Sequence, residues 1–108
     1  MDQAQILSTY AAAWAITQRM LAAARDEEWD ALIEISQDRE NLLAQLMQAQ
    51  PAPPTDPRQA AEMASLIRSI LAADQQIQSL SRAWMGEISS VLNSVQVERK
   101  LLKAYEFV

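Results

Sequence analysis

Gly86 is the only glycine among the 108 residues of the chain. Tight β-hairpins need residues with positive φ, which glycine adopts most readily, so a chain with one glycine has almost no position for them. The sequence is instead rich in Ala, Leu, Gln, Glu, Met and Arg, which favour helices. We therefore expect an all-α fold.

The proline-rich connector 51–57 is the clearest break between the predicted helices. Proline fixes φ and lacks a backbone N–H, so no helix arriving from Gln50 continues through this segment. We expect the next helix to begin at its end, with Asp56 as the N-cap and Pro57 as the first helical residue. Gln59, three positions after Asp56, would complete a capping box.

A second break is predicted at 25–28, which contains no proline. We expect Asp26 to cap a new helix there, because Asp is a favoured N-cap and the acidic residues that follow it suit the positive end of the helix dipole.

A further break at Asn93 is left open: Asn93 can cap a short last helix, or the third helix can continue. The predicted helices are about 2–25, 27–49, 57–93 and 95–106, within a single domain of residues 1–108.

Apolar residues recur at steps of three and four along each predicted helix, which is the period of one helical face. The second helix has two such rows, so we expect it to contact two neighbours. The third has the longest row, and at ~1.5 Å per residue it would reach on the order of 50 Å. These patterns predict an antiparallel bundle of three main helices with a long third helix. Because the third helix is longer than the other two, part of it must extend beyond them or contact another partner. The rows are Ile6, Tyr10, Ala13, Thr17, Met20 and Ala24 in the first helix; Leu32, Ile35, Leu42 and Leu46 beside Trp29, Ile33, Leu43 and Met47 in the second; and Ala60, Met63, Ile67, Ile70, Asp74, Ile77, Ser81, Trp84, Ile88, Val91 and Val95 in the third.

The net charge and the missing residue types exclude several classes of function. A formal charge of -5 disfavours a general affinity for nucleic acid or anionic lipid. The chain has neither Cys nor His, which removes thiolate nucleophiles, disulfides, Cys/His zinc sites and imidazole acid–base relays. We therefore expect no enzyme, with no catalytic residue, no metal and no cofactor. The first residues carry no basic region and no apolar run is long enough for a membrane span, so we expect a cytoplasmic protein.

Asp74 is the one charged residue in the apolar row of the third helix. A carboxylate among apolar neighbours costs free energy unless it is paired or hydrated. Two interpretations are open: Asp74 pairs with Arg19 or Arg39 across the bundle, or the row faces water at this level.

The acidic residues between 26 and 38 lie along a helix start and its solvent face, an arrangement that a cation site does not use.

Three segments of the chain resemble one known family. Residues 22–32, AAARDEEWDAL, followed by Arg39 and a Leu-Leu pair, are similar to its EWD.L element at the first helix junction. Residues 70–77, ILAADQQI, are similar to its IL..D..I pattern, and residues 99–105 are similar to its closing RK…AY. Taken together and in this order, the segments cover nearly the whole chain and resemble the FliT flagellar export chaperones.

The resemblance implies a chaperone that binds the C-terminal segment of the flagellar filament cap protein before type III export. It would prevent premature assembly and deliver this client to the export ATPase complex and the export gate. Family members use the long third helix and its neighbour as an apolar binding surface, which a C-terminal helix can cover. Here Val108 follows Tyr105 by three residues, so any covering helix is expected to be short.

The family's binding surface corresponds to apolar residues of the second and third predicted helices. Because Ile77 and Trp84 belong to the apolar row of the third helix, we expect Trp84→Ala and Ile77→Asp to weaken client binding with helicity largely intact. The partner-binding residues that the resemblance implies are Leu32, Ile35, Ile70, Ile77, Leu80 and Trp84.

Two alternative functions are left open by the sequence. A helical adaptor that forms homodimers through its third helix would show the same apolar row. A regulator that binds and inhibits a flagellar transcription activator, a role of some members of the family, would differ from the chaperone by its partner alone.

Overall fold

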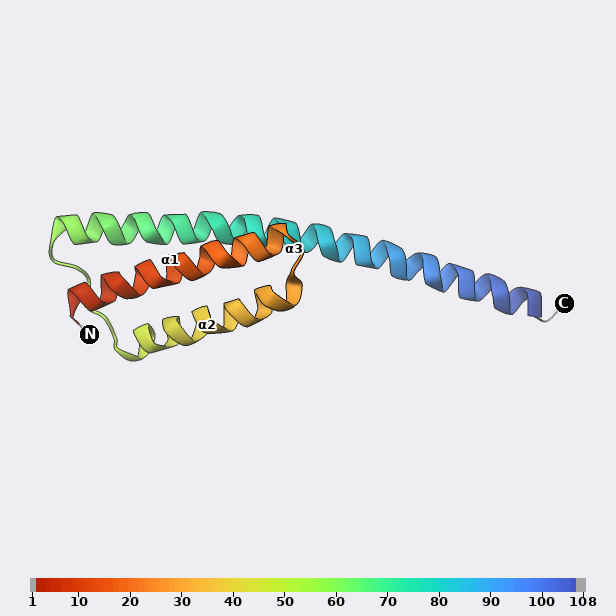
Figure 1. The fold of residues 1–108 in the computed structure, drawn as a ribbon, viewed down its shortest axis with the longest axis horizontal. Helices are drawn as coiled ribbons and strands as arrows, with labels where there is room; N and C mark the ends of the chain where they lie inside the picture. Colours follow the sequence, from red (N-terminus) through yellow and green to blue (C-terminus); the bar gives the residue numbers. More distant parts are fainter. Residues whose placement is uncertain (1, 107–108) are drawn as a thin grey trace. The chain divides into compact units, whose positions relative to one another are not determined.

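The computed structural model describes the backbone of residues 2–106 and the side chains of residues 2–87. Three helices follow one another along the chain, α1 (Gln3–Arg25), α2 (Trp29–Gln48) and α3 (Pro57–Glu106), and the described residues form no strand (Figure 1). The prediction of an all-α helical bundle is therefore confirmed.

The chain divides into two compact units, residues 1–78 and 79–108. In the first unit, α2 runs antiparallel to α1, and the first part of α3 runs antiparallel to α2 (Figure 1). The second unit begins within α3, at Ser79. The single domain 1–108 expected from the sequence stays a prediction.

α3 is one helix from Pro57 to Glu106. Of the two alternatives at Asn93, the structure has the continuous helix, and the separate helix predicted at 95–106 is wrong. Asn and Ser lower helix propensity by less than ~1 kcal/mol each, and no proline or glycine follows Asn93, so the sequence holds no strong stop there.

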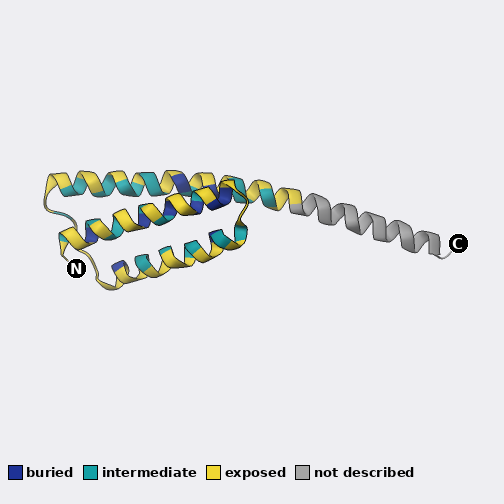
Figure 2. Ribbon diagram, in the orientation of Figure 1, coloured by how far each residue is buried: buried dark blue, intermediate teal, exposed yellow. Residues whose placement is uncertain are grey.

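The core of the first unit is centred on α1, which contributes most of its buried residues (Figure 2). The predicted row of α1 is buried as expected, except for Tyr10, which is half-buried. Several of these residues are small, and alanine at an interface allows neighbouring helices to approach closely. The buried apolar residues are Ile6, Ala13, Met20, Ala23 and Ala24 of α1, Leu32 and Leu46 of α2, and Ala73 and Ile77 of α3.

The turn between α1 and α2 differs from the prediction. Asp26 closes α1 instead of opening α2, and Glu27 follows it with φ 57°. The Glu28 N–H donates to Ala23 O (2.9 Å) and the Glu27 N–H donates to Ala24 O (3.2 Å). These two bonds form a Schellman motif, which satisfies carbonyls at the helix end and usually has glycine at the position of Glu27. The boundary predicted at residue 27 therefore moves to Trp29.

Replacing Glu27 by Gly is expected to stabilise the first unit by about 1 kcal/mol, because an L-residue with positive φ carries a steric cost that glycine lacks. The change is measured as the free energy of unfolding in urea. Glu28→Gly is the matched control, since φ of Glu28 is -86°. We expect that variant to lose stability, and an equal response of both variants would contradict the account of this turn.

The connector to α3 follows the sequence prediction more closely. α2 ends at Gln48, and Gln50 has φ 47° and donates its N–H to Met47 O (3.1 Å) before the first proline. Asp56 caps α3 as predicted, although its Oδ1 accepts from the Arg58 N–H (2.9 Å), one position earlier than the expected bond to Gln59. The caps at both ends of the connector fix where α2 ends and α3 begins.

Candidate functional site

An apolar pocket of about 230 Å³ opens on the first unit, and all three helices line it. We call it the groove. Its size exceeds the ~150 Å³ of a cavity that holds benzene, so a large apolar side chain fits inside. Its lining residues are Tyr10 and Ala13 of α1, Arg39 and Leu43 of α2, and Ile67, Ile70, Leu71 and Asp74 of α3.

The α1 side of the groove is built from the same row of residues that forms the core. Ala13 is fully buried, and its methyl group leaves space that a longer side chain would fill. Tyr10 lies one turn before Ala13 and is half-buried. The groove therefore continues the hydrophobic surface of the core outward to the solvent.

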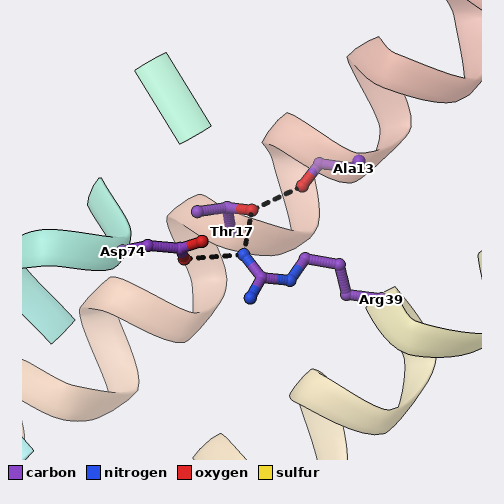
Figure 3. Close-up of polar contacts among 4 residues, drawn as sticks. All are labelled: Ala13, Thr17, Arg39 and Asp74. Carbon is purple, nitrogen blue, oxygen red and sulfur yellow. Dashed lines mark hydrogen bonds and ion pairs between the residues drawn. The ribbon is translucent and has the colours of Figure 1, made fainter. Parts of the chain in front are cut away.

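One wall of the groove is polar. Arg39 Nη1 donates to Asp74 Oδ1 (2.7 Å) and to Thr17 Oγ1 (3.1 Å), and Thr17 Oγ1 donates to Ala13 O (2.8 Å) (Figure 3). Thr17 is fully buried, while the side chains of Arg39 and Asp74 are 18% and 30% exposed. This network joins α1, α2 and α3, and pairing neutralises both charges in the groove wall.

The network also shows which of the two interpretations of Asp74 is right. Asp74 pairs across the bundle with Arg39, one of the two predicted partners, while Arg19 is exposed on α1. A hydrogen bond to a charged group is worth about 1.5–3 kcal/mol, which offsets the desolvation of a half-buried carboxylate. The pair therefore allows a charged residue to stand in an apolar row.

Large exposed apolar side chains lie on the same helix stripes as residues that line the groove. Ile33 and Met47 are 56% and 77% exposed, and Leu71 is 57% exposed. Steps of three and four residues connect Ile33 and Met47 to Leu43 on one stripe of α2, and Leu71 to Ile67 and Asp74 on one stripe of α3. We call Ile33, Met47 and Leu71 the rim. In the described part of the first unit, no other large hydrophobic residue is as exposed as these three.

The residues predicted as a partner-binding site divide into three groups. Ile70 lines the groove. Leu32 and Ile77 are buried in the core of the first unit, and Ile35 is half-buried outside the groove lining. Leu80 and Trp84 belong to the second unit, where both are half-buried and lie four positions apart on α3.

Sequence reasoning missed several lining residues, although a signal for some of them was present. The second apolar row of α2, Trp29, Ile33, Leu43 and Met47, predicts contact with a second neighbour. The structure instead leaves Ile33 and Met47 exposed. A hydrophobic row without a covering element is the signal for the α2 side of the groove.

Gly86, the only glycine of the sequence, lies in the second unit. A Cβ atom added there would meet nothing within 4 Å among the described atoms. No close approach of another segment to Gly86 is therefore seen in the described part of the chain. Glycine has a lower helix propensity than the other residues of α3 except proline, so Gly86 lowers the stability of the helix locally.

The described residues contain no group of three His, Cys, Asp or Glu side chains placed to hold a metal ion. Within the same residues, no helix has both the length and the hydropathy needed to cross a bilayer. A helical unit with an open apolar groove has the form of a module that binds another polypeptide.

The chain belongs to the FliT family, because the family model described as flagellar protein FliT matches residues 7–106. FliT proteins are flagellar export chaperones, and the family is not a family of enzymes. Comparisons with curated proteins and with solved structures give no match.

Proposed function

We propose that the chain binds the C-terminal segment of the flagellar filament cap protein in the cytoplasm. In this proposal it prevents premature assembly of the cap protein and delivers it to the export ATPase complex and the export gate. Membership of the FliT family supports the export role. The observation that supports client binding is the open apolar groove, together with the exposed apolar side chains of the rim on the adjoining stripes of α2 and α3.

The groove would bind a client by burying apolar surface. An amphipathic helix inserts side chains spaced three or four positions apart into such grooves, and a few central side chains supply most of the binding energy. Each Å² of apolar surface removed from water contributes roughly 25 cal/mol. A client helix that covers Leu71, Met47 and the pocket would therefore gain binding free energy from the apolar surface it buries. Such binding needs no catalytic group.

The groove residues have different roles in this proposal. Ile70 and Leu71 would contact the client directly, while Leu32 and Ile77 support the groove from the core. Leu80 and Trp84 stay in the proposal as a separate contact that the second unit offers to the client.

Replacing Leu71 by Asp is expected to weaken binding of the client at least about tenfold, which corresponds to about 1.4 kcal/mol. The carboxylate would lose its hydration when the client covers the groove. The measurement is isothermal titration calorimetry of the full chain with a synthetic peptide of the cognate cap protein's C-terminal segment. Leu71 is exposed, so we expect the free energy of unfolding to change little.

Ala72→Asp is the matched control, because Ala72 is the next residue of α3, is exposed and does not line the groove. We expect this variant to bind the peptide as the wild-type chain does. Equal affinity of the wild-type chain and Leu71→Asp would contradict the groove as the client site. A wild-type dimer that Leu71→Asp dissociates, with no competition from the peptide, would favour the homodimeric adaptor.

A further inference from the structure

We propose that the helix bound in the groove carries a Lys or Arg beside its apolar stripe, placed opposite Glu40 of α2. This inference rests on the proposed function and names the chemistry of the partner more closely. It follows from the different charges on the two sides of the groove.

Glu40 lies within the exposed apolar stripe of α2. Steps of three and four residues run from Ile33 through Ser36 and Glu40 to Leu43 and Met47, so these residues share one face of the helix. Glu40 is exposed, and among the side chains described, residues 2–87, it forms no ion pair. A helix covering this stripe would therefore meet a carboxylate between two apolar contacts.

The nearest cation along α2 does not neutralise Glu40. Arg39 is the only basic residue of α2, and its Nη1 lies 2.7 Å from Asp74 Oδ1 in the groove wall. The other charged residues of α2 are Asp30, Glu34 and Asp38, and all three are exposed. The outer surface of α2 is therefore uniformly acidic.

The α3 side of the groove has a different character. Asp74 is its only carboxylate in the lining, and Arg39 already pairs with it. Arg68 and Gln75, which lie beside Leu71 on the exposed surface of α3, bring one positive charge and no negative charge. A bound helix would therefore be attracted by its cations to the α2 side alone.

This asymmetry selects the partner and fixes its rotation in the groove. A Lys or Arg facing α2 would pair with Glu40 while its alkyl stem covers Leu43 or Met47. An acidic flank would face the carboxylate of Glu40 and be repelled. The same apolar stripe would therefore bind with an affinity that depends on the charge beside it.

The test uses three synthetic amphipathic helices of about 18 residues, five turns, which share one leucine stripe and differ only in the flanking residues. The flank is Lys in one peptide, Gln in the second and Glu in the third. Calorimetry with the full chain at low salt is expected to show the Lys peptide binding about fivefold more tightly than the Gln peptide, with the Glu peptide weakest. The difference should shrink at about 500 mM salt, where charges are screened beyond ~5 Å.

Glu40→Gln assigns the effect to one residue. It is expected to weaken the Lys peptide about threefold and to leave the Gln peptide unchanged, as an exposed ion pair of ~0.6 kcal/mol requires. Asp38→Asn is the control, because Asp38 is exposed on α2 outside the stripe of Glu40. We expect this control to have the smaller effect.

The outcomes distinguish a failure of this inference from a failure of the proposed function. The proposed cation opposite Glu40 would be refuted if the Lys and Gln peptides bound with equal affinity or if the Lys peptide did not bind. It would also be refuted if Glu40→Gln and Asp38→Asn had equal effects. If Leu71→Asp still weakens the cap-protein peptide, the groove stands as the client site. If Leu71→Asp changes no peptide's affinity, the groove itself is refuted.

Discussion

Ile77→Asp is expected to destabilise the first unit by at least about 4 kcal/mol, enough to abolish cooperative unfolding in a domain of ordinary stability. Ile77 is 8% exposed in the core, so the change removes about 1.5–3 kcal/mol of apolar burial and places a carboxylate there. Urea unfolding followed by circular dichroism measures the effect. This result replaces the expectation from the sequence that Ile77→Asp weakens client binding with helicity largely intact.

Gln78→Asp controls for the added charge at the next position of α3. Gln78 is exposed, so this variant is expected to change the free energy of unfolding by less than about 0.5 kcal/mol. If Ile77→Asp unfolded at the same urea concentration as Gln78→Asp, Ile77 would not be a core residue. The packing of α3 in the first unit would then need a different description.

The Arg39–Asp74 pair is expected to show a strong energetic coupling. Asp74→Leu leaves the guanidinium in the groove wall without its carboxylate, and Arg39→Met leaves the carboxylate without its cation and Thr17 without its donor. Each single variant is expected to lose about 1.5–3 kcal/mol. The double variant should lose about 1–2 kcal/mol less than the sum, because it leaves no unpaired charge. Urea unfolding of the four proteins completes the double-mutant cycle.

Arg19→Met is the control for this cycle, since Arg19 is the other predicted partner of Asp74 and is exposed on α1. Its combination with Asp74→Leu is expected to be additive within about 0.5 kcal/mol. Additive losses for Arg39 and Asp74, or a coupling with Arg19, would contradict the network that joins the three helices.

Local signals in the sequence were sufficient to predict the fold class. The near absence of glycine argues against hairpins, the proline connector separates α2 from α3, and the row from Ile6 to Ala24 identifies the face of α1 that is buried. Each of these signals acts within a few residues of its effect. Asp56 is an example, because a side chain that caps the helix beginning at the next residue needs no tertiary information.

Two local predictions failed because the sequence offered competing solutions. Asp26 has the residue type of an N-cap, but the Schellman bonds to Ala23 and Ala24 place it at the end of α1. Asn93 has the residue type of a cap as well, yet the helix continues through it. A capping residue permits a boundary, and the free energy of the adjoining turns decides whether one forms.

The candidate site was predicted only in part, because core and binding surface are both apolar. The family resemblance assigned Leu32 and Ile77 to a binding surface, although both lie in the core, and it also assigned Ile70, which lines the groove. Leu71 was missed because it lies one position beside the main row of α3. Which of two neighbouring rows faces solvent depends on the angle between helices, and that angle is a tertiary property.

The central claim is that the groove is open and accepts an apolar helical segment. Methyl NMR of the full chain, labelled at Ile, Leu and Met and titrated with the cap-protein peptide, tests it most directly. The account predicts that the methyl signals of Leu43, Met47, Ile67 and Leu71 shift as the peptide binds, while the buried Leu46 responds least. Saturating peptide binding that leaves these four signals in place would contradict the account.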